Sequence, residues 1–188
     1  ETPEYRTDGA CRITLPLGVV RAHGFAAGIS GLRALNRTRA PRSDYALDQQ
    51  TMVYLAHRDT GVILTGIKSK HDPDYSTFRV GDDAYTVSTG VLAMGDDWAE
   101  ATLTYETFTG TLRWDLGPVA RLTLRVDTDR FVVTTLPTGV DALKSSSVLA
   151  ETVRLKGFSP YSQGNAGPEK PALRFTWEKE LIIEFRGA

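Results

Sequence analysis

Short runs of alternating apolar and polar residues dominate the chain. In residues 121–126, Arg-Leu-Thr-Leu-Arg-Val, every second side chain is apolar. A period of two places such side chains on one face of a β-strand, against a core. The same pattern predicts about twelve strands, at residues 11–15, 51–57, 61–67, 77–80, 84–88, 98–107, 111–116, 119–127, 130–136, 148–155, 172–177 and 181–185.

Turn residues separate these strands. Residues 58–61, Arg-Asp-Thr-Gly, combine an aspartate with a glycine that tolerates a positive φ, so the strands of Tyr54 and Ile63 are expected to pair as a hairpin. Residues 108–110 and 127–129 are turn candidates of the same kind, and residues 177–180 are predicted to close a final hairpin. We expect a long loop at the glycine- and proline-rich residues 157–171.

The predicted fold is therefore all-β, an antiparallel β-sandwich with no helix that lasts three turns. A chain of 188 residues is long enough to bury one substantial core. We expect residues 1–9 to form an N-terminal linker or tail and residues 10–188 to form a single sandwich domain.

The charge of the chain is nearly balanced, with 22 basic and 23 acidic side chains and a net charge of -1. Such a chain has no global field to attract nucleic acid or an anionic membrane, so any electrostatic recognition must be local. The basic residues Arg33, Arg37, Arg39 and Arg42 lie either in a solvated loop or in a segment that faces an anionic partner, and both interpretations remain open. The single cysteine, Cys11, cannot form an internal disulfide. A chain without disulfides fits both the cytoplasm and a bacterial secreted protein, so the cellular compartment stays open.

Most of the candidate chemistry lies in the eight residues 68–75, Lys-Ser-Lys-His-Asp-Pro-Asp-Tyr. Binding of an acidic saccharide needs cations, and β-elimination also needs a base and a proton donor for the leaving oxygen. Lys68, Lys70, His71 and Tyr75 are therefore the candidate ligand-binding residues. Asp-Pro-Asp is equally good turn chemistry, so an exposed turn without a ligand is the competing interpretation.

Two further interpretations stay open. A metal site would use His71 with Asp72 and Asp74, approached by His57, but this spacing matches no established site, and we expect neither a metal nor another cofactor. The tryptophans either stack on sugar rings or pack in the core. Core packing is favoured at Trp114, because it shares a strand face with two leucines.

Residues 53–90 resemble part of the β-sandwich domain of heparinase II/III-like polysaccharide lyases and their uncharacterised relatives. The pattern is a hairpin turn of the form His-x-x-(Ser/Thr)-Gly, followed by a Lys-Ser-Lys segment, a short polar stretch and Ser/Thr-x-Phe. The residues that match it are His57, Thr60, Gly61, Lys68, Ser69, Lys70, Ser76, Thr77 and Phe78. The resemblance covers about a fifth of the chain.

The resemblance implies a supersandwich-like fold that normally follows a helical toroid with most of the catalytic residues. The chain has no helices for a toroid, so it is expected to be a non-catalytic accessory or C-terminal domain of a bacterial lyase, secreted or periplasmic. Its expected partners are an acidic polysaccharide or the adjacent α-helical catalytic domain, with neither nucleic acid nor membrane. The alternative is a structural or protein-interaction β-sandwich with no activity of its own.

Overall fold

The computed structural model describes residues 8–14, 16–31, 54–65, 78–81, 83–84, 89–137, 143–145, 149–158 and 166–187. These residues form strands and turns and contain no helix. The strands are β1 (Gly9–Thr14), β2 (Leu17–Ala22), β3 (Phe25–Ser30), β4 (Tyr54–His57), β5 (Gly61–Thr65), β6 (Arg79–Val80), β7 (Asp83–Ala84), β8 (Thr89–Met94), β9 (Trp98–Thr104), β10 (Thr109–Leu116), β11 (Val119–Val126), β12 (Val132–Pro137), β13 (Leu143–Ser145), β14 (Leu149–Phe158), β15 (Ala166–Trp177) and β16 (Glu180–Arg186).

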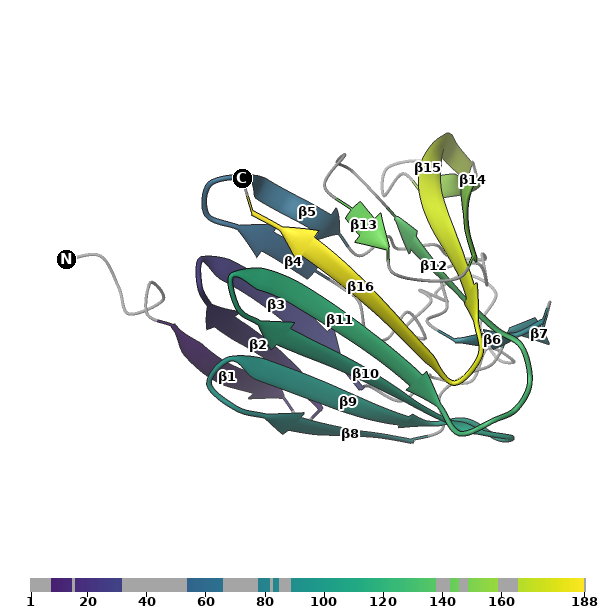
Figure 1. Cartoon of the computed structure of the whole chain (residues 1–188), viewed down its shortest axis with the longest axis horizontal. Helices are drawn as coiled ribbons and strands as arrows, with labels where there is room; N and C mark the ends of the chain where they lie inside the picture. Colours follow the sequence, from purple (N-terminus) through teal and green to yellow (C-terminus); the bar gives the residue numbers. More distant parts are fainter. Residues whose placement is uncertain are drawn as a thin grey trace.

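The strands form three antiparallel sheets (Figure 1). Sheet A has five strands in the order β1-β2-β3-β4-β5, so each strand pairs with the next in sequence. Sheet C has six, in the order β13-β16-β11-β10-β9-β8, and sheet B has five, in the order β14-β15-β12-β6-β7. The prediction of an all-β antiparallel sandwich is confirmed.

Sheets A and C lie face to face, and sheet B lies beside them (Figure 1). Contacts of β2 and β3 with β9 join A to C, and contacts of β12 with β5 join B to A. One core of buried apolar side chains draws on all three sheets, including Ile29 from A, Trp114 from C and Phe175 from B, each 0% exposed. Burial of this apolar surface is the main force that holds the sheets together.

The alternation predicted for β10 and β11 is confirmed. In β10, every second residue from Gly110 to Leu116 is buried, which places Trp114 in the core as expected. In β11, Leu122, Leu124 and Val126 are buried, as the period of two predicts. Thr123 faces the other way but is only 6% exposed, because it lies between neighbours on the adjacent strands.

Two of the predicted turns are bends between sheets. The hairpin of β4 and β5 is confirmed. Strands β9 and β10 also pair, but their turn lies at residues 105–108 and not at the expected residues 108–110, because Thr109 and Gly110 already belong to β10. The prediction of a hairpin at residues 177–180 is wrong, because β15 pairs in sheet B and β16 in sheet C. Residues 127–131 likewise carry the chain from β11 in C to β12 in B.

These two bends lie side by side and form a corner. The Val126 N–H donates to the Lys179 carbonyl at 2.8 Å, and Lys179 has a positive φ of 59°. Its side chain forms an ion pair with Asp129 at 2.9 Å, and the hydrogen bond from Lys179 lowers the pKa of Asp129. Two further hydrogen bonds join Asp127 to Thr109. The Thr109 N–H donates to the Asp127 carboxylate at 2.6 Å, and the Asp127 N–H donates to the Thr109 carbonyl at 3.1 Å.

Several strands escaped the sequence pattern. β2 and β3 were not predicted, because residues 17–30 are rich in glycine and alanine, which are poor strand formers. β8 and β13 were also missed. The predicted loop at 157–171 is too long, since β15 already begins at Ala166. Its prolines are tolerated because residues 166–171 pair only with β14, which leaves their other edge unpaired within the described residues.

The β2–β3 turn consists of His23 and Gly24, both with positive φ, at 52° and 84°. Such a two-residue turn matches the twist of a β-hairpin. A Cβ on Gly24 would lie 2.8 Å from Nε2 of His57, whose ring packs on Phe25 with centroids 4.5 Å apart. Both the backbone and the packing therefore require glycine here.

Gly24→Ala should destabilise the fold more than Gly61→Ala. Each places alanine at a positive φ, which costs about 1–2 kcal/mol, but a Cβ at Gly61 meets nothing within 4 Å. We expect the clash with His57 to add about 1–2 kcal/mol to the loss in Gly24→Ala. Urea denaturation of both variants measures the difference. Equal losses would show that the His57 ring moves aside at no cost.

Tyr105 lies in an aromatic cluster next to the β9–β10 turn. Its ring stacks on Phe108 with centroids 4.4 Å apart and meets the edge of Phe78 at 6.0 Å. The side chain is 4% exposed, and burial raises the pKa of its phenol well above the ordinary tyrosine value. The phenol of Tyr105 therefore stays neutral in the folded state at a pH at which an exposed tyrosine ionises.

This predicts a loss of stability at alkaline pH that Tyr105→Phe lacks. Above about pH 10 the unfolded state gives up the phenol proton and the folded state does not, so ionisation favours unfolding by up to about 1.4 kcal/mol per pH unit. The unfolding free energies of wild type and variant should differ by a constant amount below pH 9 and then shift against the wild type. A constant difference through about pH 11 would contradict the burial of a neutral phenol.

Candidate functional site

The candidate binding residues Lys68, Lys70, His71 and Tyr75 lie outside the residues that the structure describes. The strands on either side of them are described: β5 ends at Thr65 and β6 begins at Arg79. These two strands belong to sheets A and B, so the predicted segment connects two sheets. The assignment of these residues to a ligand stays a prediction, as does that of the basic residues Arg33 to Arg42.

Within the described residues, the best candidate site is an open groove at one end of sheet A, with a volume of about 1050 Å³. The turn of β2–β3 and the turn of β4–β5 border it, and the Arg58 N–H joins them by donating to the Gly24 carbonyl at 2.9 Å. The groove is lined by Asp8, Arg21, His23, Gly24, Phe25, Ala26, Tyr54, Ala56, His57, Arg58, Gly61, Val62 and Pro118.

One row of cross-strand neighbours lines the sheet side of the groove. Arg21 on β2 pairs with Ala26 on β3, Ala26 pairs with Ala56 on β4, and Ala56 pairs with Val62 on β5. Directly paired residues point to the same face, so this row shares the outer face of sheet A. The two alanines leave a hollow between the longer side chains of Arg21 and Val62.

Tyr54 extends the row along β4. It lies two residues before Ala56, on the same face, and is 39% exposed. Val62 is 44% exposed. The groove thus combines a small apolar floor with an accessible aromatic ring, a surface that fits the C–H face of a sugar.

The charges on the groove are mainly basic. Arg21 makes no ion pair with any residue that the structure describes. Arg58 is 77% exposed, and its Nε donates to Oδ2 of Asp59 at 3.3 Å. Asp8 is the only acidic side chain among the described residues of the lining, so these guanidinium groups favour an anionic ligand.

A second hollow of about 810 Å³ adjoins the groove at Asp8. It is acidic, with Asp8, Asp96 and Asp97 beside Trp98. Even so, no group of three or more His, Cys, Asp or Glu side chains among the described residues is arranged to hold a metal ion. Trp98 is engaged elsewhere, because the guanidinium of Arg113 lies 4.3 Å from the centre of its ring.

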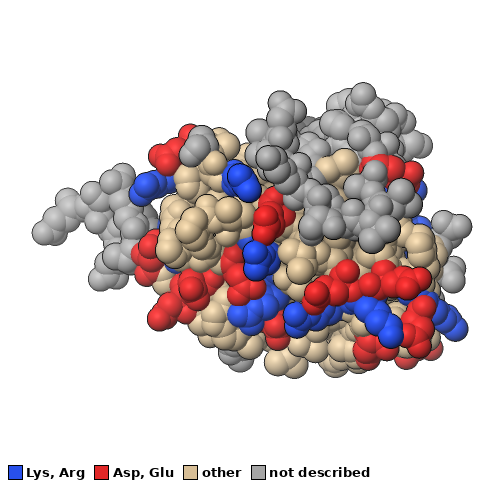
Figure 2. All heavy atoms as spheres, in the orientation of Figure 1, with Lys and Arg blue, Asp and Glu red and all other residues tan. Residues whose placement is uncertain are grey.

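The outer face of sheet C has a different character. Figure 2 shows acidic and basic side chains gathered in a band on this face. Among the described side chains of this face, three ion pairs join residues that are directly opposite on neighbouring strands: Arg113 with Glu100, Arg121 with Glu184, and Arg125 with Glu180. Each arginine faces a carboxylate across the strand, so this band is charge-compensated.

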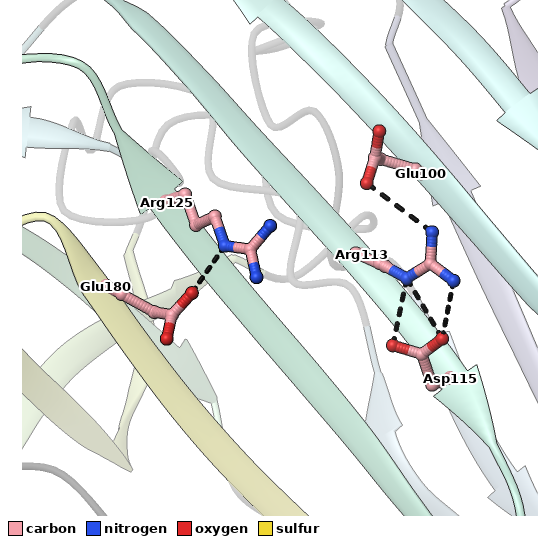
Figure 3. Close-up of polar contacts among 5 residues, drawn as sticks. All are labelled: Glu100, Arg113, Asp115, Arg125 and Glu180. Carbon is pink, nitrogen blue, oxygen red and sulfur yellow. Dashed lines mark hydrogen bonds and ion pairs between the residues drawn. The ribbon is translucent and has the colours of Figure 1, made fainter.

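Figure 3 shows the most connected of these pairs. Arg113 donates from Nε to both Asp115 oxygens at 2.9 and 3.0 Å, and from a terminal nitrogen at 2.8 Å. The hydrogen bonds to Asp115 raise the pKa of Arg113. Since its donors are already used by Asp115 and Glu100, Arg113 is a poor candidate for ligand binding.

No family model, no curated protein and no solved structure matches the chain. The likeness to heparinase-type domains therefore stays a prediction. No helix among the described residues has the length and apolarity to cross a membrane.

Sequence reasoning missed the groove because part of its lining comes from segments without a strand signal, and no local pattern places these segments beside β4 and β5. Arg21 and Ala26 lie on the two unpredicted strands β2 and β3. The one local signal is Gly24, because glycine tolerates the positive φ that a tight hairpin turn requires.

Removing an ion pair from sheet C should change stability little. Arg121 and Glu184 are 53% and 36% exposed, and exposed pairs contribute under about 1 kcal/mol. We expect Arg121→Gln and Glu184→Gln, alone or together, to lower the unfolding free energy by less than that amount. A loss above about 2 kcal/mol in thermal or urea unfolding would show that the band is essential for folding.

Proposed function

We propose that this chain is a carbohydrate-associated β-sandwich domain that binds an acidic saccharide in the groove on sheet A. The observation that carries the proposal is the row Arg21–Ala26–Ala56–Val62, with Tyr54 and Arg58 beside it. The small floor and the aromatic ring suit a pyranose, and the arginines suit its carboxylate or sulfate. The volume of about 1050 Å³ is of the size that holds ligands in other proteins.

The resemblance adds a biological setting to the proposal. If the chain is the accessory or C-terminal domain of a polysaccharide lyase, it would hold the acidic polymer while a helical catalytic domain cleaves it. Lys68, Lys70, His71 and Tyr75 would then form a second contact with the polymer. Lys70→Ala with His71→Ala in the parent enzyme tests that contact separately from the groove.

Titration with uronate oligosaccharides tests the groove. We expect Arg21→Gln and Arg58→Gln each to weaken binding about tenfold, which corresponds to one charge-assisted hydrogen bond of about 1.4 kcal/mol. Neutral oligosaccharides of the same length should bind more weakly, and added salt should weaken binding of the charged ones.

Arg121→Gln is the matched control, because it removes an exposed arginine from the outer face of the opposite sheet. It should bind like the wild type. No binding by the wild type, or equal affinity of all three arginine variants, would refute a saccharide site in the groove.

A protein-binding domain is the second candidate. The exposed Tyr54 and Val62 give the outer face of sheet A some apolar character, as a protein partner would require. The groove between these residues and Arg21 favours a saccharide, since a flat apolar patch would serve a protein better.

A further inference from the structure

His57 is an enclosed titratable side chain of the groove, with 9% of it exposed. Its ring packs against Phe25 at 4.5 Å, and a Cβ added to Gly187 would lie 2.6 to 2.7 Å from three of its ring atoms. A Cβ on Gly24 would lie 2.8 Å from Nε2. The ring is therefore held in place by β3, by the β2–β3 turn and by the residue after β16.

One hydrogen bond of this ring depends on its protonation state. The Asp59 backbone N–H donates to Nδ1 of His57 at 3.3 Å. Only an unprotonated Nδ1 accepts such a bond, so this contact fits an imidazole that carries its proton on Nε2. Protonation of Nδ1 would break this bond and place two N–H groups against each other.

The Asp59 carboxylate lies between the Arg58 guanidinium and the His57 imidazole. Its Oδ2 accepts from Nε of Arg58 at 3.3 Å and lies 3.9 Å from Nδ1 of His57. Asp59 is 58% exposed, so its side chain has room to rotate. A protonated His57 would offer this carboxylate a nearby N–H donor that cannot move away.

We propose that protonation of His57 draws the Asp59 carboxylate from Arg58 to the imidazolium and so releases the Arg58 guanidinium for an anionic ligand. Histidine is the side chain that ordinarily changes charge between about pH 5 and 8, so the groove binds anions more tightly on the acidic side. The ligand part of this inference rests on the proposed function. The exchange of partners does not.

Other charged and titratable groups surround the ring and define the controls. The β4–β5 turn carries Arg58 and Asp59, the β2–β3 turn carries His23, and Arg186 precedes Gly187 after β16. Asp8 and Arg21 also line the groove. His23 is the one other histidine among these groups, so His23→Asn separates the effects of the two histidines.

NMR tests the exchange without any ligand. The Nε–H signal of Arg58 should shift with pH at the same midpoint as the ring protons of His57. This behaviour should persist in His23→Asn and vanish in Asp59→Asn, which keeps the backbone donor to Nδ1 but removes the charge. Asp59 is exposed, so this variant is expected to fold. An Arg58 signal that ignores the His57 titration would overturn the proposal.

Binding then tests the consequence. Affinity for a uronate oligosaccharide should rise about tenfold from pH 8 to pH 5.5 in the wild type and in His23→Asn, and about threefold or less in Asp59→Asn. Equal rises in wild type and Asp59→Asn would overturn the exchange. If no saccharide binds at either pH while the Arg58 signal still follows His57, the proposed function fails and the exchange stands.

Discussion

The corner at residues 127–131 and 178–179 is the constraint on which the rest of the fold depends. The strand pair β11–β16 in sheet C and the strand pair β12–β15 in sheet B are two halves of the same bent ribbon. The hydrogen bond from Val126 to Lys179 and the Asp129–Lys179 ion pair keep the two segments of this ribbon together at the bend. Because both segments bend at the same place, sheet B lies beside the A–C sandwich and adds its apolar residues to the same core (Figure 1).

The corner also determines which faces of the strands meet water. The inner face of sheet C is occupied by Leu122, Leu124 and Trp114, which leaves its arginines and carboxylates on the outside. There the register of the antiparallel strands places opposite charges directly across from each other. A face whose charges are already paired offers little to an anionic ligand, so the band stabilises the sheet rather than recognising a partner.

Sheet A has the opposite design. Its central strand β3 is built from phenylalanine, alanine, glycine, isoleucine and serine, so it packs closely on the core yet leaves a hollow on the outside. The arginines on this side, Arg21 and Arg58, border that hollow, and Arg21 has no acidic partner among the described residues. His57 and Asp59 lie at the same end of the sheet, so the turns of β2–β3 and β4–β5 border the groove and also surround this histidine.

Much of the candidate site depended on information that local patterns do not carry. Residues 68–75 stand out in the sequence because charged and titratable side chains are dense there, and they lie outside the described residues. The groove instead draws on residues from about 8 to 118, and its arginines stand on or beside strands that alternate weakly. The sequence suggests His57 only as a possible metal ligand or as part of the hairpin-turn pattern, because nothing near it in sequence indicates its contacts with Phe25, Gly24 and Gly187.

The sequence by itself determined the all-β class, the faces of β10 and β11 and the hairpin of β4–β5. It also indicated the pairing of β9 with β10, although it placed their turn too far along the chain. These features follow from side-chain alternation and turn residues, which act within a few positions. Only the tertiary structure decided which strands share a sheet. A turn such as residues 177–180 has the same local chemistry whether the next strand folds back or crosses to another sheet, and the choice depends on distant partners such as Val126 and Asp129.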